Sequence, residues 1–183
     1  MSSILPSGRP RLERNAIEQI LHTAKVTAAV AIVGIRGYFR DTMGKPGVND
    51  RGIYDDALFI ISPTAFVSFN GNVDPSVERK AIAVLQPGVW RYKLGIHGLS
   101  KPAAQRYKAL VQAGPVTVLR DQAGYDTGEF GINIHRGGIN GTSSLGCQTI
   151  PPAQWPSFIS LIESELKRAN QTIVPYVLTQ QAG

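Results

Sequence analysis

Cysteine, histidine and tryptophan are scarce in this sequence. Its 183 residues include one cysteine, three histidines and two tryptophans. A single cysteine excludes an internal disulfide, so Cys147 is either a small buried apolar residue or a free reactive thiol. No zinc-finger, RRM or helix-turn-helix signature is present, and the aromatic residues do not alternate with lysine and arginine. These absences argue against a metal centre and against a nucleic-acid partner.

Long hydrophobic runs are absent as well. The most apolar stretch covers residues 26–35, and ten residues are too few to span a bilayer. The preceding segment carries Glu13 and Glu18, and no small-residue cleavage site follows before Arg36, so this stretch does not have the form of a signal peptide. We therefore expect a protein made in the cytoplasm without a signal peptide and without stable membrane insertion.

Charged residues are few and unbalanced. They make up 17% of the chain against 43% hydrophobic residues, which is typical of a globular protein with one core. Nineteen basic and thirteen acidic residues give a net charge of +6, which favours a polyanionic partner: nucleic acid, an anionic envelope or a wall polymer. Charge alone does not choose among these. We expect a monomer in which residues 1–183 form one domain, with a mobile segment at 1–9.

Apolar patterns along the chain predict many short strands and two good helices, one from Pro10 and one from Pro151. Strands are expected at 26–39, 57–61, 66–69, 81–85, 89–96, 116–119, 125–135 and 173–178. A further short helix is expected at 107–111. Because strands and helices do not alternate regularly, the expected class is α+β and β-rich. It is a mainly antiparallel sheet or sandwich with an N-terminal and a C-terminal helix packed on it.

Adjacent carboxylates at Asp55 and Asp56 suggest metal binding or acid–base chemistry. No histidine or glutamate lies near them in the sequence to complete such a site. We therefore interpret both as solvated turn residues.

Residues 129–150 hold the features with the clearest chemical meaning. The segment from Phe130 to His135 alternates as a strand does and places His135 at its end. A glycine-rich loop follows, and Cys147 closes it twelve residues after that histidine. A thiol attacks a carbonyl well when a neighbouring base lowers its pKa, and this spacing lets His135 fold back to do so. Backbone N–H groups around Gly146 are the candidate donors to the oxyanion.

A second histidine could serve as the base. The strand expected at 89–96 runs into His97-Gly98, which repeats the arrangement of a strand-end histidine before glycine. His135 is favoured because it is nearer to Cys147 in the sequence. The other role for His97 is to bind substrate or to orient the site.

The segment Ser144-Leu145-Gly146-Cys147, with His135 upstream, resembles the signature of the YkuD-like L,D-transpeptidase fold. In that family Ser-His-Gly-Cys is followed by an apolar residue and an arginine. The resemblance covers about twenty residues. It implies that Cys147 is the nucleophile and His135 the general base, and that Gly146 and Ser144 shape the oxyanion site.

The chain departs from this signature at three positions. Leu145 stands where the family has histidine, and Gln148 and Thr149 stand where it has the apolar residue and the arginine. Arg136, beside Gly137 in the glycine-rich loop, is a candidate to bind substrate in place of that arginine.

A small basic chain with this motif and no secretion signal is similar to bacteriophage endolysins of this fold, which hydrolyse peptidoglycan stem peptides. The resemblance implies a cysteine peptidase that forms an acyl-enzyme without a cofactor and acts on the wall after release from the cell. If an amine replaces water, the same acyl-enzyme gives a wall crosslink, as in an L,D-transpeptidase. A non-catalytic wall-binding or virion protein that uses the basic surface is the alternative from another class.

Overall fold

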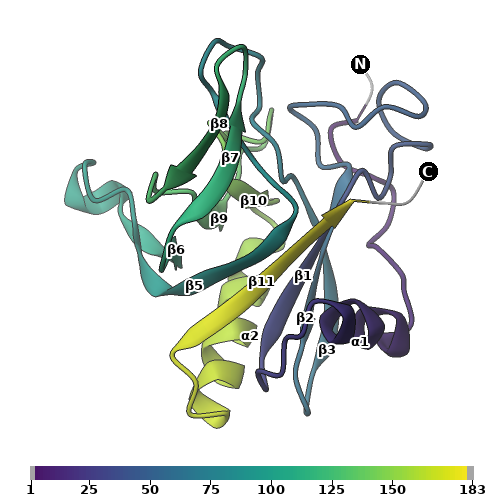
Figure 1. Cartoon of the computed structure of the whole chain (residues 1–183), viewed down its shortest axis with the longest axis vertical. Coiled ribbons are helices and arrows are strands. Elements are labelled where there is room, and N and C mark those ends of the chain that lie inside the picture. The colour runs from purple at the N-terminus through teal and green to yellow at the C-terminus, as the bar shows by residue number, and fades with distance from the viewer. Residues whose placement is uncertain (1–2, 181–183) are drawn as a thin grey trace.

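The computed structural model describes residues 3–180 and contains two α-helices and eleven strands within them (Figure 1). The helices are α1 (Arg14–Thr23) and α2 (Trp155–Arg168), and a short 3-10 helix covers Ala103–Gln105. The strands are β1 (Ala31–Arg36), β2 (Asp56–Ile61), β3 (Phe66–Gly71), β4 (Ala83–Leu85), β5 (Gly88–His97), β6 (Tyr107–Gln112), β7 (Val116–Arg120), β8 (Gly124–Gly128), β9 (Ile134–Arg136), β10 (Gln148–Ile150) and β11 (Ile173–Gln180). None of the helices formed by these residues is long and apolar enough to cross a bilayer.

Eight strands form one sheet in the order β10-β9-β6-β5-β11-β1-β2-β3. The pairs β1–β11 and β9–β10 are parallel, and the other neighbours run antiparallel. The two edge strands also approach each other. Asn72, which follows β3, pairs with Thr149 of β10 through two backbone hydrogen bonds of 2.9 and 2.8 Å. The sheet therefore curls until its edges meet, and β9 and β10 lie beside the seam.

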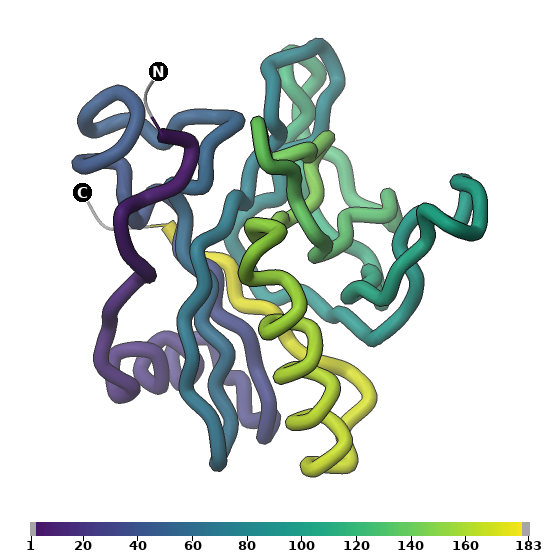
Figure 2. The backbone as a smooth tube through the Cα atoms, turned by 180° about the vertical axis from the view of Figure 1, so that it is seen from behind, coloured from purple at the N-terminus to yellow at the C-terminus, as the bar shows by residue number. Residues whose placement is uncertain are grey.

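The two helices cover opposite faces of the sheet, and Figure 2 shows α2 in front of the strands when the molecule is seen from behind. Strand β2 shows the sequence basis of this arrangement. Leu58 and Ile60 belong to the core beneath α2, whereas Ala57 and Phe59 belong to the core beneath α1. On α2 the buried apolar residues recur at helical spacing; they are Trp155, Phe158, Ile162 and Leu166. Burying each such side chain contributes about 1.5–3 kcal/mol.

The remaining strands form a small antiparallel sheet in the order β4-β7-β8, which projects from the main sheet at the top of Figure 1. Strands β7 and β8 form an antiparallel hairpin. Arg51, from the long loop between β1 and β2, makes a bidentate ion pair with Asp121 at the turn of this hairpin. The ion pair fixes that loop against the small sheet.

The structure confirms the α+β, strand-rich class with a mostly antiparallel sheet, but several predicted elements differ. The short helix predicted at 107–111 is wrong, because these residues lie in β6. Strand β6 pairs with β5 over six residue pairs, and this long-range pairing overrides local helix propensity. Strand β1 begins at Ala31 and not at residue 26. The strand predicted at 125–135 is divided between β8 and β9.

Residues 3–9 belong to the segment predicted to be mobile, of which residues 1–2 lie outside the described part. The carbonyl of Ile4 accepts a hydrogen bond of 2.8 Å from the backbone N–H of Tyr54. The carbonyl of Gly8 accepts one of 2.9 Å from the side-chain amide of Asn70. This segment therefore lies against β2 and β3.

Asp55 and Asp56 are fully buried, so the prediction that they are solvated turn residues is wrong. Asp56 accepts the backbone N–H groups of Gly37 and Val73, both at 2.6 Å, and Asp55 accepts that of Asp50 at 2.9 Å. Burial, reinforced by neighbouring carboxylates, raises the pKa of Asp55 to about 7 and that of Asp56 well above its ordinary value. Hydrogen bonding to the backbone makes this burial possible.

Candidate active site

The parallel strands β9 and β10 carry the two candidate catalytic residues. His135 is the middle residue of β9, and Cys147 immediately precedes β10. The register pairs Gln148 with Ile134. Cys147 therefore comes level with Asn133, which lies two residues before His135 on the same face of the sheet. The thiol and the imidazole share that face.

The two strand-end histidines are in contact. The rings of His97 and His135 stack with their centroids 4.0 Å apart and their planes at 21°. Tyr107, the first residue of β6, lies beside them with its ring centroid 5.4 Å from that of His97. Strand β6 separates β5 from β9, and its small residue Ala109 pairs with Gly95 of β5. The space beside Gly95 is filled by the side chain of Val111, which a Cβ at Gly95 would meet at 2.6 Å.

His135 is a neutral imidazole whose Nε2 is available as a base. The side chain is 5% exposed, and burial, with help from the neighbouring His97, lowers its pKa to about 4. Its Nδ1 lies 2.8 Å from the carbonyl oxygen of Arg136. A carbonyl can only accept a hydrogen bond, so Nδ1 carries the proton and Nε2 has the free lone pair. The hydroxyl of Tyr107 donates to the same carbonyl at 3.3 Å and supports this orientation.

The basic nitrogen of His97 already accepts a hydrogen bond. The Oδ1 atom of Asn133 accepts the backbone N–H of Gln112 at 3.1 Å, so the Nδ2 group of Asn133 faces His97. This Nδ2 group lies 3.3 Å from Nδ1 of His97 and donates to it. Burial also lowers the pKa of His97. This arrangement favours His135 as the base, and His97 holds the His135 ring by stacking on it.

Cys147 is half-buried and rests as a thiol. The backbone N–H of Asn133 lies 3.4 Å from Sγ, and the thiol donates to the carbonyl of Gly131 at 3.5 Å. Burial raises the pKa of Cys147, and the N–H group of Asn133 offsets only part of this rise. Among the described residues, neither imidazole is a hydrogen-bond partner of Sγ. The resting pair is therefore a neutral thiol and a neutral imidazole, without the lowered thiol pKa expected from the sequence.

Ser144 and Gly146 fix the loop that leads into Cys147. The Oγ atom of Ser144 accepts the backbone N–H of Gly146 at 3.0 Å and donates to the carbonyl of Cys147 at 2.6 Å. Gly146 has a φ of +127°, and a Cβ there would lie 2.6 Å from the carbonyl oxygen of Ala83. The N–H of Gly146 is thus already hydrogen-bonded to Ser144. The N–H of Cys147 has no acceptor within residues 3–180 and can point at an oxyanion.

A polar pocket of about 470 Å³ opens beside the stacked imidazoles. Its lining includes four of the residues predicted from the sequence; these are His97, His135, Arg136 and Gly137. Gly137 is required by close packing, because a side chain there would collide with the hydroxyl of Tyr54. That hydroxyl donates a hydrogen bond of 2.7 Å to the carbonyl of Gly138. We call this cavity the imidazole pocket.

A second pocket, of about 540 Å³, lies on the thiol side of the site. Gly131 and Asn133, whose backbone groups contact Cys147, form part of its wall. Gly98 lines both pockets. The two pockets are therefore neighbours, one beside the imidazoles and one beside the backbone groups that contact Cys147, although Cys147 itself lines neither.

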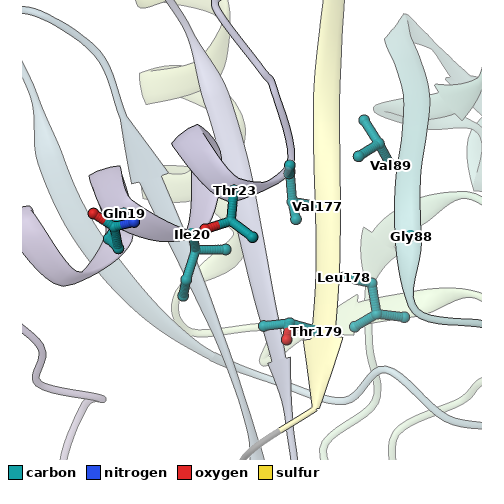
Figure 3. A pocket seen from close by; sticks show the side chains of 9 residues that line it. Gln19, Ile20, Thr23, Gly88, Val89, Val177, Leu178 and Thr179 are labelled. Carbon is teal, nitrogen blue, oxygen red and sulfur yellow. The ribbon is translucent and has the colours of Figure 1, made fainter.

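An apolar pocket of about 390 Å³ lies elsewhere, between α1, β5 and β11 (Figure 3). Its wall includes Ile20, Val89 and Leu178 and no ionisable side chain. It shares no residue with the imidazole pocket and offers no group for acid–base chemistry. In residues 3–180, no three His, Cys, Asp or Glu side chains gather so as to hold a metal ion.

Comparisons of the chain with protein-family models, curated proteins and solved structures found no match. The resemblance to YkuD-like L,D-transpeptidases therefore rests on the residues of the motif alone.

Sequence reasoning missed three residues that the structure adds to the site, namely Tyr107, Asn133 and Lys101. Asn133 had a usable signal, since it lies two residues before His135 and alternation puts both on one face. Tyr107 and Lys101 had no such signal in the sequence. Tyr107 begins β6 and Lys101 lies in the connection from β5 to β6, so the pairing of these two strands brings them to the site.

Proposed function

We propose that this protein is a cysteine-dependent peptidase that hydrolyses peptidoglycan stem peptides, with the YkuD-like fold as its family. One observation carries the proposal: a half-buried thiol and a neutral imidazole with a free Nε2 share one face of adjacent parallel strands. The polar pocket beside them provides a place for a peptide. The net charge of +6 favours attraction to an anionic wall.

In the proposed reaction, Cys147 turns from the carbonyl of Gly131 towards the substrate. Its sulfur attacks the peptide carbonyl carbon while Nε2 of His135 takes the thiol proton. A carbon–sulfur bond forms, and the oxyanion is held by the backbone N–H of Cys147. The carbon–nitrogen bond then breaks, and the imidazolium gives its proton to the leaving amine.

Water completes the cycle. His135 removes a proton from the water molecule, which attacks the thioester, and the products are a free carboxylate and the restored thiol. An amine in place of water would yield a crosslink, so the identity of this acceptor separates a hydrolase from an L,D-transpeptidase.

Purified protein incubated with peptidoglycan sacculi tests the proposal, with soluble and crosslinked products analysed by mass spectrometry. We expect the wild type to release peptide fragments, and Cys147→Ala and His135→Gln each to lose at least about a hundredfold of this activity. His22→Gln is the matched control, because His22 is exposed on α1. Activity that survives Cys147→Ala rejects the mechanism.

The raised pKa of the thiol favours a second candidate, a non-catalytic protein that binds the wall through its basic surface. It predicts that wild type and Cys147→Ala co-sediment equally with sacculi and that neither releases or links peptide. Thiol-dependent turnover rejects this candidate.

A further inference from the structure

The imidazole pocket has a positive wall. Lys101 and Arg136 line it, together with His97 and His135, and none of its lining residues is acidic. Among the described residues, neither Lys101 nor Arg136 forms an ion pair. Two cations without acidic partners in a concave site create a positive potential that attracts anions.

Both cations are held in place through their surroundings. The guanidinium of Arg136 lies over the ring of Tyr107 at 4.8 Å, which orients its plane and leaves its edge free to donate. The backbone of Lys101 is fixed on both sides, since its N–H donates to Gly98 at 2.8 Å and its carbonyl accepts from Arg106 at 2.8 Å. The pocket is therefore formed before a ligand arrives.

The cations are also tied to the catalytic base. The carbonyl of Arg136 is the acceptor that holds Nδ1 of His135, and the adjacent side chain of Arg136 faces the same pocket. An anion bound by Arg136 thus lies next to the imidazole that takes the thiol proton.

We infer that the imidazole pocket binds a carboxylate of the substrate, with Arg136 as a bidentate donor and Lys101 as a second cation. This inference rests on the proposed function for its catalytic meaning and names the substrate class, a peptide with a free carboxylate near the bond that is cut. Arg136 suits a planar carboxylate because its N–H groups form a matching fork.

Binding to the Cys147→Ala protein tests the inference without turnover. The probes are a synthetic stem peptide with free carboxylates, the same peptide amidated at its C-terminus, and the same peptide amidated at its diamino acid. We expect one amidated form to bind about tenfold more weakly than the free peptide, since a charge-assisted contact is lost. Which form is weakened identifies the carboxylate that enters the pocket.

Variants assign the effect to the pocket. Added to the Cys147→Ala protein, Arg136→Gln and Lys101→Gln should each weaken binding of the free peptide about tenfold and reduce its preference over the amidated form. Arg136→Lys should restore part of the preference because it keeps the charge. Arg91→Gln is the matched control, because it removes one exposed positive charge elsewhere on β5.

Equal binding of all three peptides, absence of binding, or a preference that survives loss of both cations would overturn the inference. These outcomes differ from a failure of the proposed function. Turnover without carboxylate preference rejects the pocket alone, whereas preference without thiol-dependent turnover rejects the peptidase and keeps the anion site.

Discussion

At the scale of single residues, the site joins two groups that are both uncharged at neutral pH. Burial lowers the pKa of His135 to about 4 and raises that of Cys147, so each environment disfavours the charged form. In such a pair the cysteine is not a preformed thiolate at neutral pH. In the proposed reaction the proton would move only when a substrate carbonyl is present to accept the sulfur, so this pair would act by general-base catalysis.

The first prediction concerns the reactivity of Cys147 in the free protein. Because its pKa lies above the ordinary value of 9.0, alkylation by iodoacetamide should be slow at pH 7 and should accelerate only above about pH 9. The measurement is the alkylation rate as a function of pH, followed by mass spectrometry. The denatured chain is the control, because its solvated thiol should react faster at each pH. Rapid alkylation of the folded protein below pH 7 would instead reveal a preformed thiolate.

At the scale of elements, the loop from β9 to β10 decides where the thiol lies. It covers residues 137–147. Near its end Gly146 has a φ of +127°, and a Cβ there would lie 2.6 Å from the carbonyl oxygen of Ala83. Ser144 holds the loop through hydrogen bonds to the residues on either side of the Gly146–Cys147 peptide bond. The position of the Cys147 thiol therefore depends on one glycine and one hydroxyl.

The second prediction follows from that geometry. Gly146→Ala should lower the free energy of unfolding by about 1–3 kcal/mol, because the new methyl group meets a backbone carbonyl and the positive φ disfavours alanine. Gly141→Ala in the same loop is the matched control, since its Cβ would meet open space. Urea denaturation of both variants measures the difference. Equal stabilities would show that the loop does not need glycine at position 146.

Local pattern was enough to predict some elements and not others. The strand 57–61 and the apolar face of α2 were predictable, because alternation and helical spacing are properties of the segment itself. Strand β6 was not, because its state is decided by pairing with β5. For the same reason the sequence predicted His135 near Cys147 but not the stacking of His97 or the amide of Asn133. These contacts require β6 to lie between two strands that are distant in the sequence.

At the scale of the whole molecule, a buried acidic cluster lies at one end of β2, close to the seam of the sheet. Asp74 pairs with Arg36 at 3.2 Å, and both side chains are almost fully buried. Asp55 and Asp56 lie near this pair, and the charge of Asp74 acts on both of them. Burial is the main cause of the raised pKa values of Asp55 and Asp56, and the neighbouring carboxylates add to it.

The third prediction is a pH dependence of stability that Asp55 causes. Its pKa is about 7 in the folded protein against 3.8 in a solvated chain, so between these values the unfolded state binds fewer protons. The free energy of unfolding should therefore fall as the pH rises from about 4 to about 7. Asp55→Asn keeps an oxygen for the N–H of Asp50 and cannot ionise, so it should be more stable than the wild type by about 1–3 kcal/mol at pH 8 and nearly equal at pH 4.

Urea denaturation at both pH values measures this difference, with Glu129→Gln as the control, because Glu129 is exposed and has no ion pair among the described residues. His135 acts with the opposite sign, because its folded pKa of about 4 lies below 6.5 and the unfolded chain gains protons first as the pH falls. Comparing Asp55→Asn with the wild type cancels that contribution. A parallel pH dependence of the two proteins would contradict the assignment to Asp55.

The bridge between Asn72 and Thr149 joins β3 to β10, and on the other side of β10 lies the strand that carries His135. Cys147 and His135 thus lie next to the two-bond bridge that joins the two edges of the sheet. If this bridge opened, β10 and the adjoining Cys147 could move away from β3. A peptide bound to both edges would then favour the closed arrangement.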